Sequence, residues 1–256
     1  LTRATELADE VLASPAADET AVGWAGSAAA LCAARAGRLA DVDALAERAM
    51  SAGQPGLLRF TSGFGQTTAL LLAGEPDRAL TLAQRLTDFA ERRQPGRAIG
   101  EVLTADVLIA RGDLQRAVTL LRDAAATLTP TGYSWGPMAW MLLAQALGRL
   151  GETVEAGKAL SRAESRHGLK SMLFAPELAV ARAWTTAARR DSHGAVAAVR
   201  DAVKAAERGG QHAVALRAAV DALRLNDPRA VETLTRLSGQ VDCAFGRDAL
   251  TGARGA

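Results

Sequence analysis

The feature that most constrains the fold is a turn signal that recurs along the whole chain. Similar phrases surround six turn positions, and the first five are 37, 38, 39 and 39 residues apart. A shorter and more degenerate copy follows, with an asparagine at its turn. A regular period of this length is typical of proteins built from stacked supersecondary units. The six turn positions are Gly37, Gly74, Gly112, Gly151, Arg190 and Asn226.

Each unit has the pattern of a helix, a tight turn and a second helix. The unit around Gly74 reads "LLAGEPDRALTLAQRL" from Leu71, and glycine at such a turn accepts the left-handed backbone that ends many helices. An isolated helix pair cannot bury its apolar face, so successive pairs must stack. We therefore predict one all-α domain over residues 1–256, a right-handed superhelix of about six antiparallel helix pairs.

The composition agrees with a helical, water-exposed repeat protein. The apolar residues make up 49% of the chain and are mostly Ala, Leu and Val, while aromatic residues make up only 4%. The formal net charge is +2, and no basic stripe with interleaved aromatic residues indicates nucleic-acid binding. Cys32 and Cys243 lie far apart, which fits a cytoplasmic protein without disulfides, and we expect no membrane segment.

The stretch "SGFGQTT", residues 62–68, resembles a phosphate-binding loop and needs a separate test. Such a loop requires a glycine five residues before a Gly-Lys pair and a buried strand that leads into it. Phe60 occupies the place of the first glycine and Gln66 that of the lysine. No strand is predicted, so residues 57–73 are interpreted as a helix, with Gly63 and Gly65 either where neighbouring helices cross closely or where the helix is weak.

Catalytic and metal-binding patterns are not found in the sequence. His167, His193 and His212 fall in different repeats, and none has a second histidine or a cysteine at ligand spacing. No GxSxG motif occurs. We therefore expect a protein that is not an enzyme and that has no metal site and no cofactor.

The segment "TGYSWGPMAWM", residues 131–141, concentrates aromatic residues in a chain that has few of them. One interpretation is that these side chains fill wide gaps between repeats. The other is that Tyr133, Trp135 and Trp140 form a stacking surface for a ligand on the concave face. Equivalent first helices carry Arg59, Gln66 and Glu101, which we include as candidate polar groups of that ligand- or partner-binding site.

Several phrases resemble the superhelical repeat region of large LuxR-type transcriptional regulators of the MalT-like group, particularly actinobacterial ones. They include "LIARGDLQRAVTLLRDA" from Leu108 and "MLLAQALGRLGETVEAGKALSRAE" from Met141, and the resemblance is strongest over residues 70–240. In that family a nucleotide-binding module precedes the repeats and a DNA-binding helix-turn-helix follows them. The repeats receive an inducer or a protein partner and control self-association.

The resemblance implies that this chain is the regulatory part of a longer regulator. It would then bind an inducer or a partner, and neither ATP nor DNA by itself. A free-standing repeat scaffold that binds a peptide of another protein is the alternative. The two interpretations differ in the coding sequence around the repeats, because only the first requires the two flanking modules.

Overall fold

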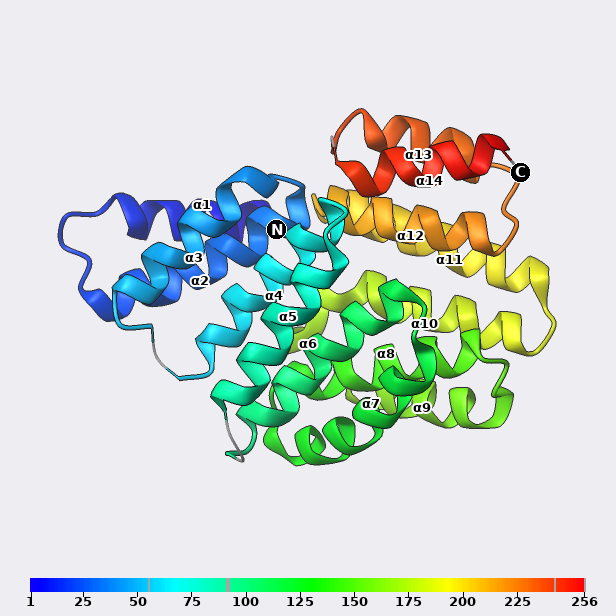
Figure 1. Cartoon of the computed structure of the whole chain (residues 1–256), viewed down its shortest axis with the longest axis horizontal. Coiled ribbons are helices and arrows are strands. Elements are labelled where there is room, and N and C mark those ends of the chain that lie inside the picture. The colour runs from blue at the N-terminus through cyan, green and yellow to red at the C-terminus, as the bar shows by residue number, and fades with distance from the viewer. Residues whose placement is uncertain (55, 91–92, 242, 256) are drawn as a thin grey trace.

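The computed structural model describes residues 1–54, 56–90, 93–241 and 243–255, and these residues form fourteen α-helices and no strand. Figure 1 shows the helices stacked side by side along a curved path. The prediction of an all-α stack of about six helix pairs is confirmed. The pairs are α2 (Glu19–Ala36) with α3 (Val42–Ser51), α4 (Leu58–Leu72) with α5 (Pro76–Phe89), α6 (Gly96–Arg111) with α7 (Leu114–Leu128), α8 (Trp135–Arg149) with α9 (Thr153–Arg166), α10 (Ala175–Ala188) with α11 (Ser192–Arg208), and α12 (His212–Arg224) with α13 (Ala230–Ser238).

Two further helices flank the six pairs, α1 (Thr2–Ala13) before them and α14 (Ala244–Gly255) after them. Three short 3-10 helices lie in connections: η1 (Leu39–Asp41), η2 (Thr129–Thr131) and η3 (Leu169–Phe174). None of the helices over the described residues is long and apolar enough to cross a membrane.

The turn inside each of the six pairs has a left-handed backbone. Gly37, Gly74, Gly112 and Gly151 have φ angles of 93°, 78°, 84° and 79°. Arg190 and Asn226, at the last two turns, have φ angles of 64° and 59°. Glycine adopts this conformation without a steric penalty, whereas a residue with a Cβ atom is strained there. The six positions that set the sequence period therefore share one backbone conformation.

The first helix of a pair is buried more completely than the second. In α6 twelve residues are buried, from Gly96 to Ile109, because neighbouring helices cover it on most sides. The second helix α7 buries one stripe, made by Ala117, Val118, Leu121, Ala124, Ala125 and Leu128, and exposes the other. The first helices thus line the inside of the curve and the second helices cover its outside.

Helix α4 confirms the interpretation of the "SGFGQTT" stretch as part of a helix. A Cβ atom on Gly65 would lie 2.8 Å from the carbonyl oxygen of Ala30, so the backbones of α4 and α2 nearly touch there. A Cβ atom on Gly63 would lie 2.4 Å from Leu86 Cδ1 on α5. Both glycines therefore mark close helix crossings, the first of the two predicted possibilities.

The last repeats return to the first. Helix α12 contacts α2, and α14 contacts α4, although these helices are separated by most of the chain. The side chain of Val241, which follows α13, packs beside Gly37 at the end of α2. Figure 1 shows the end of α4 next to α12 and the α13–α14 pair. The superhelix consequently encloses part of its own inner surface.

Candidate binding site on the inner surface

The two tryptophans predicted to be in a ligand site are buried in the structure. Trp135 packs edge-on against Phe64, with ring centroids 5.6 Å apart, and lies 6.3 Å from Phe174. Trp140 donates a hydrogen bond from Nε1 to Thr129 Oγ1 at 2.9 Å and lies under the guanidinium of Arg162. Tyr133 is 46% exposed. Of the three rings, only that of Tyr133 offers a solvent-exposed surface for stacking.

The three polar candidates each have a local partner. The guanidinium of Arg59 lies 3.6 Å from the ring centroid of Phe89, and Gln66 Nε2 donates to Asp43 Oδ1 at 3.0 Å. Glu101 Oε1 accepts a hydrogen bond from Arg97 Nε at 3.1 Å. Burial raises the pKa of Glu101, and the charge of Arg97 opposes that rise. The six predicted residues therefore do not converge on one place, and their role in binding stays a prediction.

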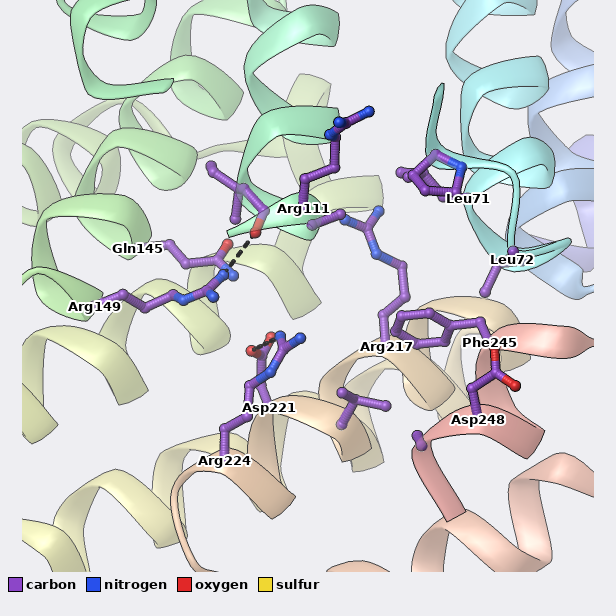
Figure 2. A pocket seen from close by; sticks show the side chains of 16 residues that line it. Leu71, Leu72, Arg111, Gln145, Arg149, Arg217, Asp221, Arg224, Phe245 and Asp248 are labelled. Carbon is purple, nitrogen blue, oxygen red and sulfur yellow. Dashed lines mark hydrogen bonds and ion pairs between the residues drawn. The ribbon is translucent and has the colours of Figure 1, made fainter. Parts of the chain in front are cut away.

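A different set of residues surrounds a cavity of about 360 Å³ inside the closed curve. Helices α4, α6, α8, α12 and α14 contribute its walls, so it lies where the sixth pair and α14 come back to the second, third and fourth pairs. Figure 2 shows side chains from these helices pointing toward a shared space. Its size falls at the lower end of the range of small-molecule sites, roughly 300–1,000 Å³.

The charged side of the cavity comes from α12 and α8. Arg217, Asp221 and Arg224 lie four and three residues apart on α12, a spacing that places them on one helix face. Gln145 and Arg149, four residues apart on α8, face them across the cavity. Helical periodicity thus places each set on one face of its helix, and the turn of the superhelix brings the two faces together.

Arg217 forms a two-point ion pair with Asp106 on α6. Its Nη2 lies 2.8 Å from Asp106 Oδ1 and its Nη1 lies 3.2 Å from Oδ2. Burial lowers the pKa of Arg217, but the adjacent carboxylate of Asp106 more than offsets this effect and the net pKa is raised. Asp106 is only 3% exposed. This charge-assisted pair joins two helices that are more than a hundred residues apart.

Among the arginines that line the cavity, Arg149 has the positive charge that nearby carboxylates compensate least. Its Nη1 donates to the carbonyl oxygen of Ile109 at 2.8 Å, and its guanidinium lies 5.6 Å from the ring centroid of Trp184. No carboxylate of the described residues comes within ion-pair distance of it. Burial lowers the pKa of Arg149, and the nearby charge of Arg224 lowers it further.

Asp221 is the buried carboxylate between these arginines. Arg224 Nη1 approaches its Oδ1 at 3.4 Å, a long and single contact. Burial raises the pKa of Asp221, although Arg224, Arg149 and Arg217 all act in the opposite direction. Asp221 is therefore a buried carboxylate with one long ion-pair contact, to Arg224.

A second buried cation ties the ends of the superhelix together. Arg35 on α2 is only 2% exposed. Its Nε donates to Gln211 Oε1 at 2.7 Å, and its Nη2 lies 2.8 Å from Glu177 Oε1. The same nitrogen donates to the carbonyl oxygen of Leu173 at 2.9 Å. Arg35 thereby links the first pair to α10 and to the residue that precedes α12.

Sequence reasoning missed the cavity, yet a local signal was present. Arg35, Asp106 and Arg217 each interrupt an apolar helical run, namely "ALCAARAG", "LTADVLIA" and "VALRAAV". Charged residues in such runs are buried only when they are paired. No group of three or more His, Cys, Asp or Glu side chains suited to a metal ion occurs among the residues that the structure describes.

Comparisons with known proteins bear on the fold. No protein-family model matches the chain, and no curated protein matches it either. A crystal structure of a Rap protein complexed with competence and sporulation factor is similar over 99% of this chain and 70% of its own, with 15% identity and a TM-score of 0.66. The fold is a TPR-like α-solenoid.

Two other solved structures match less well. A Podosopora anserina protein of nearly identical TPR-like repeats, described as a kinesin light chain, has 19% identity and a TM-score of 0.43 over 71% of this chain and 94% of its own. The APC/C hetero-tetramer Cut9-Hcn1 has 13% identity and a TM-score of 0.45, over 97% of this chain and 58% of the matched chain.

Proposed function

We propose that this chain is the sensing and interaction domain of a cytoplasmic LuxR-type transcriptional regulator and that its inner cavity is the sensing site. The observation that carries the proposal is the cavity between the early helices α4, α6 and α8 and the late helices α12 and α14, with the incompletely compensated Arg149 in its wall. Catalysis is not part of the proposal. The assignment to a LuxR-type regulator rests on the resemblance of the repeat phrases to the repeat region of that family.

The position of the cavity suits a sensor. Its walls come from α4 and α6 on one side of the closure and from α12 and α14 on the other. A ligand held between them would contact early and late repeats together and would favour the closed form over an open one. A ligand can shift such an equilibrium only through its different affinity for the two forms. Ligand binding would then alter the surface that the repeats offer to other domains or to a second copy.

The alternative function is a free-standing scaffold that holds a peptide of a partner protein. The resolved Rap protein, similar in fold, is in complex with competence and sporulation factor, which favours binding of a partner by this architecture. The coding sequence on both sides of the repeats separates the alternatives. The regulator hypothesis requires an upstream phosphate-binding loop and a downstream helix-turn-helix, and a complete gene that lacks both contradicts it.

The sensing site can be tested with a cavity-filling substitution. Ala110 on α6 is a partly exposed position in the cavity wall, so Ala110→Trp places a large side chain in the space that a ligand would occupy. Ala197→Trp, on the exposed side of α11, is the matched control. A thermal-shift panel of sugars, nucleotides, amino-acid metabolites and carboxylates is measured on the wild-type chain and on both variants.

A ligand of the cavity should stabilise the wild type and Ala197→Trp but not Ala110→Trp. At 100 times its dissociation constant, a ligand stabilises the folded state by about 2.7 kcal/mol. If every stabilising compound acts equally on both variants, or if no compound of the panel stabilises the chain, the cavity is not the sensing site.

A further inference from the structure

The cavity has two chemically different sides. One side is apolar. The carboxyl-terminal end of α4 contributes Leu71 and Leu72 to it, and the amino-terminal part of α14 contributes Phe245. Helices α8 and α12 supply the charged side described above. Figure 2 shows Leu71, Leu72 and Phe245 opposite Arg149, Gln145 and Arg224. A molecule that fills this space must itself have a polar end and an apolar end.

The charges of the polar side leave one positive charge uncompensated. Arg217 is neutralised by Asp106 in a two-point pair. Arg224 pairs with Asp221 at 3.4 Å and is itself exposed, whereas Arg149 has no carboxylate of the described residues within ion-pair distance. Arg111, which pairs with the exposed Asp77, and the exposed Asp248 are screened by water.

The N–H donors of the Arg149 guanidinium also indicate that this cation lacks an anionic partner. A guanidinium has five N–H donors in a rigid fork that matches the two oxygens of a carboxylate. One of these donors reaches the carbonyl oxygen of Ile109. The other donors have no protein acceptor in the described part of the chain. A partly buried cation in this state is destabilised until an anion supplies the missing charge and the missing acceptors.

The size of the cavity limits the ligand further. About 360 Å³ accommodates a small molecule or the last one or two residues of a peptide, and not a long folded segment. Arg149 is the one lining arginine without a carboxylate partner, and its single charge matches a monoanion better than a phosphate monoester, which carries a charge of nearly −2 at neutral pH. The combination of one negative charge and an apolar body describes a carboxylate with a hydrocarbon chain or an apolar side chain.

We infer that the inner cavity binds an amphipathic monocarboxylate, with its carboxylate between Arg149 and Arg224 and its apolar body against Leu71, Leu72 and Phe245. This inference rests on the proposed function and specifies its ligand. The carboxylate can belong to a small metabolite or to the C-terminus of a partner protein that ends in an apolar residue. Both sources present the same chemistry to the cavity.

The test compares acids with their uncharged amides. The whole chain is titrated with octanoate and octanamide, with acetyl-Gly-Leu and its amide, and with inorganic phosphate, by thermal shift and by calorimetry. Octanoate or the peptide acid should bind at least about tenfold more tightly than its amide, because charge-assisted hydrogen bonds to the arginines are lost in the amide. Phosphate, which has no apolar body, should bind more weakly than either acid.

Variants assign the binding to the arginines. Arg149→Gln should weaken binding of the acid by about tenfold or more, while Arg149→Lys, which keeps the charge, should restore part of the loss. Arg224→Gln is a second test in case the first variant does not fold. Arg116→Gln, on the exposed side of α7, removes an arginine outside the cavity and should leave binding unchanged.

Each result has a definite meaning. Preference for octanoate identifies a small metabolite, and preference for the peptide acid identifies a protein C-terminus; both support the inference. Equal binding of acid and amide, or acid binding that survives both Arg149→Gln and Arg224→Gln, overturns it. If no carboxylate binds but another compound stabilises the wild type and not Ala110→Trp, the ligand class is wrong while the proposed function stands. If no compound stabilises the wild type more than Ala110→Trp, both the inferred carboxylate ligand and the proposed sensing site are wrong.

Discussion

Gly65→Ala should destabilise the protein even though alanine is the better helix former. Gly65 lies in the middle of α4, where a Cβ atom would be 2.8 Å from the carbonyl oxygen of Ala30 and 3.1 Å from the amide nitrogen of Leu31. Both are backbone atoms of α2, so neither can rotate away as a side chain can. The two helices would have to separate by several tenths of an ångström.

Two opposing contributions determine how much Gly65→Ala changes the free energy of unfolding. Alanine in place of glycine inside a helix contributes about 1 kcal/mol of stability. Overpacking of a close contact costs about 1–3 kcal/mol, and the upper part of this range applies because backbone atoms on both sides must shift. The net loss in the free energy of unfolding should therefore be about 1–2 kcal/mol.

Gly157→Ala is the matched control. Gly157 lies inside α9, and the nearest atom to its added Cβ would be Arg189 Nη2 at 3.1 Å, at the end of a long and flexible side chain. That side chain can move, so only the gain in helix propensity remains, about 0.5–1 kcal/mol. The same chemical change should thus have opposite signs at the two positions.

Urea unfolding followed by far-UV circular dichroism measures both effects. The unfolding midpoint should fall for Gly65→Ala and rise for Gly157→Ala, with an unchanged helical signal before unfolding. Because repeat proteins can unfold in several steps, the slopes must also be compared with the wild type. If Gly65→Ala stabilises the protein as much as Gly157→Ala does, the close crossing of α4 and α2 is refuted.

Three further predictions concern the turns and the ion pairs. Arg190→Gly should raise the free energy of unfolding by about 0.5–1 kcal/mol, seen as a higher urea midpoint, because the φ of 64° strains any residue with a Cβ atom. Asp227→Asn should cost roughly 1–2 kcal/mol at pH 7. The hydrogen bond from Arg200 chiefly lowers the pKa of Asp227, so its contribution is present above the ordinary Asp pKa and is lost as the pH falls through the lowered value. Unfolding curves recorded from pH 7 downward should show the difference between variant and wild type shrink as the pH falls below the ordinary Asp pKa. Asp221→Asn should tighten octanoate binding in calorimetry by about fivefold, since it removes a negative charge that pairs with Arg224 and would repel a bound carboxylate.

The sequence predicted the architecture because each repeat carries its own local signal. The glycine that ends a first helix and the apolar stripe of a second helix are short-range features, and they recur often enough to exclude chance. Local sequence also excluded a phosphate-binding loop, because Phe60 and Gln66 occupy the positions where the motif needs a glycine and a lysine. The glycines of that stretch instead allow α4 to approach α2 and α5.

The aromatic cluster was harder to interpret from sequence, because a tryptophan that fills the core and one that binds a ligand have the same local pattern. Trp135 and Trp140 start the same first helix, and only the surrounding helices decide their exposure. Phe64 and Phe174, which surround Trp135, come from distant parts of the chain. Local periodicity places a side chain on a helix face but does not show which element covers that face.

The cavity depends on how far the superhelix turns over six pairs, and small rotations between neighbours add up beyond what a local pattern specifies. The isolated charges in apolar runs nevertheless contain part of the answer. Arg35 has no acidic residue, and Asp106 no basic residue, three or four positions away on its own helix. A charge buried in an apolar helix without such a neighbour must find its partner on another helix. The sequence therefore implies that Arg35 and Asp106 are held by tertiary ion pairs, and Glu177 and Arg217 become their partners only because the fifth pair comes back to the first and the sixth to the third.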